Sequence, residues 1–465
     1  MPTFLSTDIL FFLLLSALAG TVFHAARREH LRRPWRKVAC STSAMVSLVI
    51  LLVFLFIAVL DSIRFPPAAS AGRNGEAQYR NEPVSLLDRW LAPIKSRVEK
   101  TYSAPLSAYA YAKETIRQPD GSERWDFPRL RYGGAHLADP ERDKPADILW
   151  TGAQGLGEGL VVWLVPAALG LAGLGWRERS GFPARVLAIL RGNSEVPWRG
   201  IGLALLFVCL AGGALGELGL KYHVLGTGKV GEDVFYQSLK SVRTGLLIGT
   251  LTTFATLPLA LGFGILAGYF RGWVDDAIQY LYTTLNSIPG VLLIAAAMLV
   301  MQSYMARHEA EFASLALRSD FRLLALCLIL GMTSWTGLCR LLRAETLKLR
   351  ELEYVQAARA LGVRQGTILL RHILPNLFHL VLISVALDFS SLVLAEAVLS
   401  YINIGVDPSM DSWGNMINGA RLEMARDPVV WWSLAAAFLF MFALVLPANL
   451  FADAVRDAFD PRRGE

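Results

Sequence analysis

Two carboxylates, Asp388 and Glu396, lie inside a strongly apolar run of this 465-residue chain. Ionisable groups in such runs are costly, and they face protein or water in preference to lipid. Their spacing of eight residues places both side chains on one face of a helix. The pair could line a transport path and hold a cationic amino group, or the two could be hydrogen-bonded structural groups between helices.

A second group of candidates lies in the charged stretch 345–376, which separates two apolar runs. Its centre, 356–362, reads Gln-Ala-Ala-Arg-Ala-Leu-Gly and is rich in strong helix formers up to the glycine. Gly362 can adopt the left-handed conformation that ends a helix, and Pro375 marks a second break. We therefore predict a short helix, a turn and a second short helix. Three alanines should give the first helix a smooth surface for a partner protein: Ala357, Ala358 and Ala360.

No catalytic constellation accompanies these candidates. Residues 226–229 read Gly-Thr-Gly-Lys, but the glycine spacing and the following Ser or Thr of a phosphate-binding loop are missing. His372 has no serine, cysteine or carboxylate arranged around it. The net charge of +6 is modest and needs no nucleic-acid partner. We expect a chain that is not an enzyme and binds no metal, cofactor or nucleic acid.

The composition indicates a membrane protein. Hydrophobic residues make up 54% of the chain and charged residues 18%, a combination that soluble domains rarely show. Several apolar runs reach the roughly 20 residues that a helix needs to cross a bilayer. We predict an all-α polytopic membrane protein with about nine transmembrane helices. The predicted spans are 9–26, 41–60, 160–176, 201–220, 244–270, 278–301, 323–342, 377–399 and 429–451.

Charge distribution orients the predicted spans. Basic residues follow the first span, so the N-terminus is expected in the periplasm and the C-terminus in the cytoplasm. The predicted parts are two helices with a basic cytoplasmic loop in 1–60, a periplasmic insert in 61–157, a third helix with a basic cytoplasmic loop in 158–200, and a six-helix core in 201–465. Within the insert, Pro119-Asp120-Gly121 predicts a turn. Small residues four apart, Gly212 with Gly216 and Gly264 with Gly268, predict close helix packing.

Several stretches together resemble one protein family. Residues 353–362 and 371–376 resemble the EAA loop of permease subunits of bacterial ABC importers. Five further stretches match in the same order: 225–235, 266–275, 394–400, 412–416 and 457–462. The resemblance covers 223–463 and is strongest to the second permease of the dipeptide, oligopeptide and nickel subfamily. One departure is Gln356, which stands where the family usually has the first Glu of its signature.

This resemblance implies a fold, partners and a mechanism. The last six helices would form a type I importer permease core, and the loop 345–376 would dock in a groove of a separate ATPase. The residues implied for this ATPase coupling are Glu353, Gln356, Ala357, Ala358, Arg359, Gly362 and Pro375. The implied partners are a second homologous permease, two ABC ATPases that use ATP and Mg, a periplasmic binding protein and the lipid of the bacterial inner membrane. In this setting Asp388 and Glu396 could hold the amino terminus of a transported peptide.

Other functions stay open at this point. An importer for nickel or another small solute would have the same permease architecture. An ion-driven secondary transporter is a further alternative, although that class often shows internal repeats and none is evident here. A membrane enzyme is the third, although no nucleophile or metal cluster supports it.

Overall fold

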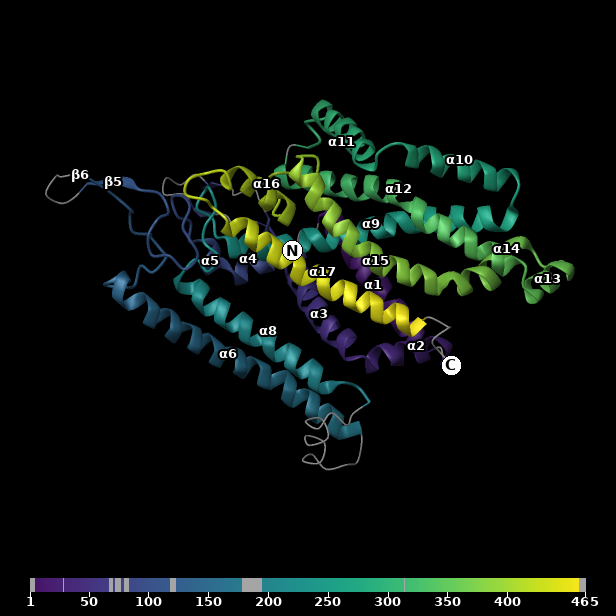
Figure 1. The fold of residues 1–465 in the computed structure, drawn as a ribbon, viewed down its shortest axis with the longest axis horizontal. Coiled ribbons are helices and arrows are strands. Elements are labelled where there is room, and N and C mark those ends of the chain that lie inside the picture. Colours follow the sequence, from purple (N-terminus) through teal and green to yellow (C-terminus); the bar gives the residue numbers. More distant parts are fainter. Residues whose placement is uncertain are drawn as a thin grey trace.

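Apolar runs in this chain form long helices that lie roughly side by side along the longest axis of the molecule (Figure 1). A computed structural model describes residues 5–27, 29–66, 70–71, 77–78, 83–117, 123–177, 195–312 and 314–459. The helices are α1 (Ser6–Arg27), α2 (Glu29–Cys40), α3 (Thr42–Ser62), α4 (Leu86–Trp90), α5 (Ala92–Lys95), α6 (Pro140–Arg177), α8 (Trp198–Lys221), α9 (Val234–Phe270), α10 (Trp273–Ser287), α11 (Gly290–Arg307), α12 (Leu315–Arg350), α13 (Glu353–Ala360), α14 (Gln365–Ile368), the π-helical η1 (Leu369–Ile373), α15 (Leu374–Tyr401), α16 (Trp413–Glu423) and α17 (Trp432–Phe459).

The strands are short and form antiparallel pairs within the predicted insert. The pairs are β1 (Arg64–Phe65) with β4 (Val84–Ser85), β2 (Ser70–Ala71) with β3 (Ala77–Gln78), and β5 (Glu114–Arg117) with β6 (Glu123–Asp126). In the last pair, Glu114 lies opposite Asp126 and Arg117 lies opposite Glu123. The predicted turn at 119–121 connects these two strands but lies outside the described residues.

Eight helices of the described chain are long and apolar enough to cross a membrane. They overlap eight of the nine predicted spans. The remaining predicted span, 323–342, lies in α12, and much of α12 is buried against α9. The all-α polytopic prediction is therefore confirmed.

Two predicted boundaries differ from the structure. The run 278–301 is divided between α10 and α11, because Pro289 disfavours helix at the residue before it and α11 begins after it. The third span begins early, since α6 starts at Pro140 inside the predicted insert. Asp139 accepts a hydrogen bond from the Glu141 N–H at this helix start. The basic loop predicted after α6 lies largely in 178–194, outside the described residues.

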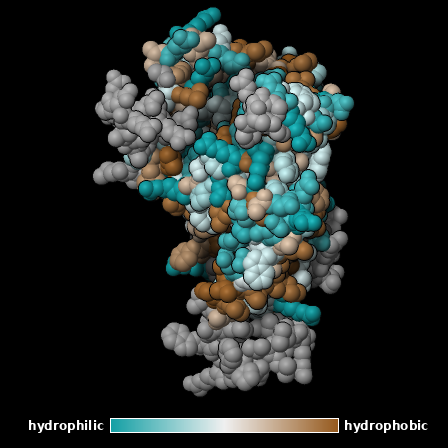
Figure 2. Space-filling view, turned by 90° about the vertical axis from the view of Figure 1, so that its left-hand side faces the viewer, coloured by the Kyte–Doolittle hydropathy of each residue, from teal (hydrophilic) through white to brown (hydrophobic). Residues whose placement is uncertain are grey.

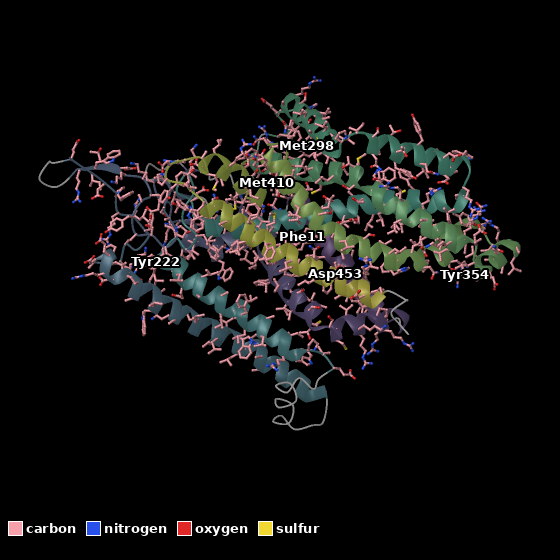
Figure 3. All side chains as sticks on the ribbon, viewed as in Figure 1. Phe11, Tyr222, Met298, Tyr354, Met410 and Asp453 are labelled. Atoms are coloured by element: carbon pink, nitrogen blue, oxygen red, sulfur yellow. The ribbon has the colours of Figure 1, made fainter. Side chains whose placement is uncertain are left out.

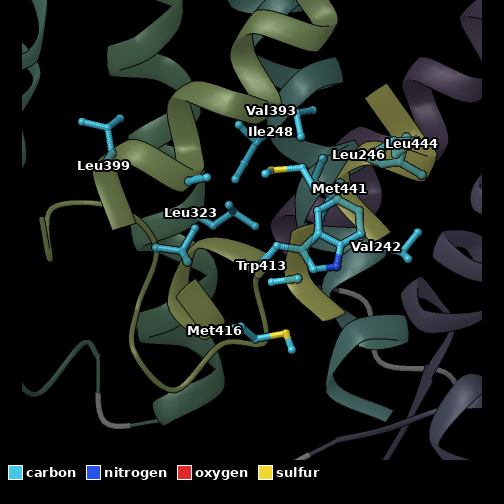
Figure 4. Close-up of a cluster of buried hydrophobic side chains, with 14 of the residues drawn as sticks. Val242, Leu246, Ile248, Leu323, Val393, Leu399, Trp413, Met416, Met441 and Leu444 are labelled. Carbon is cyan, nitrogen blue, oxygen red and sulfur yellow. The ribbon is translucent and has the colours of Figure 1, made fainter. Parts of the chain in front are cut away.

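The most extensive contact between two helices of the described chain joins α9 and α12. A Cβ atom added at Gly264 would lie 2.8 Å from the Leu342 Cβ, and one at Gly268 would lie 2.6 Å from the Thr346 Cβ. The packing predicted for this glycine pair is confirmed. Around the same helices, Trp413 of α16 lies in the main hydrophobic cluster (Figure 4) and donates its indole N–H to the Ser238 carbonyl at 3.1 Å.

A second close contact joins α6 to α8. A Cβ atom at Gly155 would lie 2.4 Å from the Gly213 carbonyl oxygen, and one at Gly159 would lie 2.3 Å from the Cys209 carbonyl oxygen. By contrast, a Cβ atom at Gly212 or Gly216 would meet no described atom within 4 Å. The predicted contact through Gly212 and Gly216 is therefore wrong. The close packing of α8 against α6 occurs at Gly213, which lies between them in the sequence.

The two ends of the helix bundle differ. The β5–β6 hairpin lies at one end, which we call the insert end, and α13 with α14 lies at the other, which we call the loop end (Figure 1). Seen from the insert end, the central surface is mostly hydrophilic (Figure 2). Leu87 and Ile94 of the insert are buried against Phe235 and Tyr236 at the start of α9. The insert is thus packed onto the helix bundle.

Candidate functional site

The predicted helix–turn–helix at the loop end is present. The helix α13 ends before Gly362, whose φ of +75° is left-handed. The Gly362 N–H donates to the Arg359 carbonyl and the Val363 N–H donates to the Ala358 carbonyl, both at 3.1 Å. These two bonds form a Schellman motif, which satisfies carbonyls at the helix end. The predicted role of Gly362 as a helix terminator is confirmed.

One face of α13 is buried against the rest of the chain. Val355 and Ala358, three residues apart, belong to a buried cluster with Tyr269 of α9 and Ile368 of α14. Ala357 and Ala360 are exposed. The prediction that Ala358 contributes to an outward surface is wrong, because the helical repeat turns it toward Val355 and the core.

Polar contacts hold α13 to the ends of α9 and α12. The Arg350 guanidinium donates to the Tyr269 carbonyl at 2.6 Å, and the Arg359 guanidinium lies 5.1 Å from the centre of the Tyr269 ring. Gln356 donates to the Glu351 carbonyl at 3.1 Å, which satisfies a backbone acceptor where α12 ends. Tyr269 lies within the family-like stretch 266–275, but no feature of the sequence singles it out.

The second predicted break is absent. Pro375 lies in the first turn of α15, where a proline is well tolerated, and the chain stays helical through η1 into α15. Asn376 donates to the Tyr354 hydroxyl at 2.9 Å and so ties the start of α15 to α13. Glu353 lies in the first turn of α13, where a negative charge is favourable.

The outward surface of this loop carries apolar side chains. Leu361 is 83% exposed, and Leu352 and Tyr354 are also exposed. Tyr354 lies at the loop end of the molecule (Figure 3). Together with Ala357 and Ala360 these residues form what we call the outer face of α13. Its alanines lie opposite Val355 and Ala358 on the helical repeat. Exposed Glu353 and Gln356 lie beside them, so the surface combines apolar and polar groups, as protein contact surfaces do.

The structure separates the two carboxylates that were expected to share a face. Glu396 is buried, accepts a hydrogen bond from the Ser400 hydroxyl at 2.7 Å, and lies where a Cβ atom on Gly414 would approach its Oε1 to 2.8 Å. It is therefore packed between α15 and α16. For Glu396 the structural interpretation is favoured.

Asp388 has a different environment. Its side chain is exposed and lines a cavity of about 80 Å³ between α9, α12 and α15. No described residue forms an ion pair or a hydrogen bond with its carboxylate. Hydroxyl side chains share the lining of this cavity: Thr253, Thr256, Ser334 and Ser391.

Charged groups that the sequence did not single out join the insert to the core. His223 lies between Glu99 of the insert, at 3.4 Å, and Asp233, at 2.7 Å. Glu99 also accepts backbone N–H groups of Arg131 and Tyr132. Burial alone would lower the pKa of His223, but the two carboxylates raise it to about 9. Burial would raise the pKa of Glu99, but His223 and the backbone donors hold it at about 2. We call this group the His223 clamp.

A second buried ionic group ties α1 and α3 to α9. Arg243 is 2% exposed and donates to Asp8, Thr7 and Ser62. Asp8, at 0% exposed, lies 235 residues away along the chain. Such pairs cannot be assigned from sequence, because neither residue lies in a motif that names its partner.

The sequence is similar to those of known transport proteins. Residues 260–465 match the family described as "Binding-protein-dependent transport system inner membrane component". The glutathione transport system permease protein GsiD of Pectobacterium atrosepticum is 32% identical over 242 residues, 52% of this chain and 73% of that protein. The oligopeptide transport system permease protein OppC of Mycobacterium tuberculosis is 30% identical, over 51% of this chain and 76% of that protein. The dipeptide transport system permease protein DppC of Lactococcus lactis is 28% identical, over 52% of this chain and 65% of that protein.

A solved structure of the methionine ABC transporter MetNI aligns with 48% of this chain and 98% of its own chain, with a TM-score of 0.35 and 14% identity. The relatives with curated names favour an importer permease over an ion-driven transporter or a membrane enzyme. With 32% identity over nearly three quarters of one such permease, the chain belongs to the binding-protein-dependent transport system inner membrane components, the permease subunits of ABC importers.

Proposed function

We propose that this chain forms half of the path of an ATP-driven peptide importer, together with a second homologous permease. The substrate class is supported by the relatives, which are named as permeases for glutathione, oligopeptides and dipeptides. None of these three names includes nickel. Transport of nickel or another small solute is therefore treated as an alternative result of the transport experiment below.

The proposed orientation places the insert end in the periplasm and the loop end in the cytoplasm. Support comes from the basic helix α2, which lies toward the loop end (Figure 1). Its basic residues are Arg32, Arg33, Arg36 and Lys37. Lysine and arginine favour the cytoplasmic side of a membrane protein. In this orientation the N-terminus is periplasmic and the C-terminus cytoplasmic, and the hydrophilic insert meets the periplasmic binding protein.

The outer face of α13 is the proposed docking surface for an ATPase subunit. The supporting observation is that α13 is anchored on one face and exposes apolar groups on the other. A short helix held in this way transmits a displacement to α12 and α15 instead of absorbing it. ATP and Mg are used by the ATPase subunits, and closure of these subunits drives alternating access here.

Adjacent alanines test this docking. Ala357→Trp adds bulk on the outer face and is expected to abolish co-purification of the ATPase while leaving the thermal stability of the permease unchanged. Ala358→Trp adds the same bulk inside the buried cluster and is expected to destabilise the permease itself. Lys113→Trp at the insert end is the matched control and should affect neither. Full ATPase co-purification with Ala357→Trp contradicts the proposed docking surface.

Substrate class is tested in proteoliposomes that contain the chain with its second permease, ATPases and binding protein. ATP-dependent uptake of di- to oligopeptides is the expected result. Uptake of nickel without uptake of peptide would assign the importer to a different solute. Uptake of solute by the isolated chain without ATPases would overturn the importer mechanism.

A further inference from the structure

Asp388 lies deep within the membrane-crossing part of α15. It is near the middle of this 28-residue helix. At 1.5 Å per residue, each helix end is about 20 Å away. An aspartate side chain is far too short to reach either interface. Its exposed carboxylate must therefore be accommodated at depth.

Lipid is an unfavourable environment for the Asp388 carboxylate. An aspartate at the centre of a membrane helix is strongly unfavourable, and such groups face other protein or water. Within the part of the chain that the structure describes, no cation pairs with Asp388. The helix surface that carries it therefore faces something outside this chain, and it differs from surfaces such as Phe254 and Leu328, which are apolar and exposed.

The cavity beside Asp388 presents hydrogen-bond acceptors. The Thr253 and Thr256 hydroxyls donate to carbonyls of their own helix, at 2.7 and 2.9 Å, and the Ser391 hydroxyl donates to the Asp388 carbonyl at 2.7 Å. Since each hydroxyl has one hydrogen, which it already donates, it can only accept a hydrogen bond from a group in the cavity. With the carboxylate these oxygens favour a donor-rich cation and disfavour an anion.

The size of the cavity limits the ligand further. Its volume of about 80 Å³ is well below the roughly 300–1,000 Å³ of sites that enclose a drug-sized molecule. A primary ammonium group fits such a space, whereas a whole peptide does not. A ligand would place only its charged end in the cavity while the remainder lies along the helix surface.

We propose that the Asp388 cavity is a subsite on the translocation path that binds the primary ammonium group of a transported peptide. This inference rests on the proposed peptide importer for the identity of the ligand. The site itself, a cation-binding recess at the exposed surface of α15, stands on the geometry alone. Asp388 would make importer function depend on a free amino terminus, because an acylated terminus lacks both the charge and two of the three donors.

The first experiment needs no transport. In the assembled complex, Ser391→Cys is treated with two methanethiosulfonate reagents of similar size, one cationic and one anionic, and labelling at residue 391 is measured by mass spectrometry. The cationic reagent is expected to react roughly tenfold faster, and this preference should disappear when Asp388→Asn is added. Equal labelling by the two reagents, labelling by neither, or an unchanged preference in the double variant contradicts a cation-binding recess.

The second experiment measures transport by the complete importer in proteoliposomes. Initial uptake of a peptide with a free amino terminus, presented on saturating binding protein, is expected to fall roughly tenfold or more in Asp388→Asn and to recover in Asp388→Glu. Glu396→Gln, a carboxylate on the same helix, is the matched control and should leave the uptake within about twofold. An unchanged rate in Asp388→Asn overturns the inference. Absence of peptide uptake by the unaltered importer would instead refute the proposed function. In that case the labelling experiment would still show whether the Asp388 cavity attracts cations.

Discussion

Ionisable groups in this molecule follow two different rules at two depths. Near the junction of the insert with the helices, Arg243, Asp8 and His223 are almost fully buried, and each has an oppositely charged partner within reach. Near the middle of α15, Asp388 is exposed and no described residue pairs with it. The difference shows that an ionisable residue in a membrane-crossing helix can have either of two roles. Paired groups hold elements together, whereas an unpaired group indicates contact with something beyond the chain.

Removing one partner of a buried pair should have the largest effect. Arg243→Met leaves the Asp8 carboxylate buried without its main cation, and breaking such a pair lowers the free energy of unfolding by about 3–5 kcal/mol. Thermal unfolding of the detergent-purified protein measures this loss. Arg142→Met, at an exposed position of α6, should change stability by less than about 0.5 kcal/mol. Equal stability of the two variants would show that the Arg243 pair is not structural.

The His223 clamp predicts a pH dependence of somewhat smaller size. A pKa raised from 6.5 to about 9 corresponds to about 3 kcal/mol of stabilisation. Because the folded pKa lies above the unfolded one, this contribution is complete below pH 6.5 and is lost as the pH rises through about 9. Hydrogen exchange at 98–101 and 222–233 should therefore accelerate between pH 7 and pH 10.

The control for this prediction is His223→Gln, which cannot carry the charge. Its exchange rate in the same two segments should be higher at pH 7 and should lack the rise around pH 9, once the intrinsic pH dependence of exchange is subtracted. The same acceleration in His223→Gln and in the unaltered chain would assign the pH effect to another group.

Sequence patterns were sufficient for the parts of this fold that depend on local chemistry. A bilayer requires every backbone group to be bonded within its helix, so long apolar runs such as that of α3 translate directly into spans. Gly362 ended its helix as predicted, because left-handed backbone favours glycine whatever surrounds it. The break at Pro289 was missed because the apolar run continues on both sides of it.

Contacts between segments that are distant in the sequence could not be predicted from local sequence patterns. Ala357 and Ala358 are the same residue type, and the packing of α13 against Tyr269 of α9 and Ile368 of α14 decides which of them is buried. Asp8, which pairs with Arg243, and Glu99, one of the two carboxylates beside His223, likewise precede α9 by more than a hundred residues. Asp388 and Glu396 stand out in the sequence as two carboxylates in one apolar run, but their separate environments depend on how α16 covers the end of α15.

A smaller effect is expected at the end of α13. Gly362 has a left-handed φ of +75°, and a Cβ there would meet no described atom within 4 Å. Gly362→Ala therefore introduces backbone strain of about 1–2 kcal/mol without a steric clash. Hydrogen exchange of 353–364 should accelerate, and coupling of ATP hydrolysis to transport should weaken. Gly366→Ala, within α14 and equally open, should leave both unchanged.

The smallest effect on stability is expected at Asp388, the same residue whose substitution should most affect transport. Since no described group depends on its carboxylate, Asp388→Asn removes a desolvation penalty and breaks no pair, so the free energy of unfolding should stay the same or rise by up to about 1 kcal/mol. Thermal unfolding of this variant beside Arg243→Met sharpens the contrast between the two depths, because both remove one charge from the membrane-crossing helices. A destabilisation by Asp388→Asn comparable to that by Arg243→Met would mean that Asp388 has a structural partner in the folded chain. Its role would then be that of the buried pairs, and the path would have to lie along another surface.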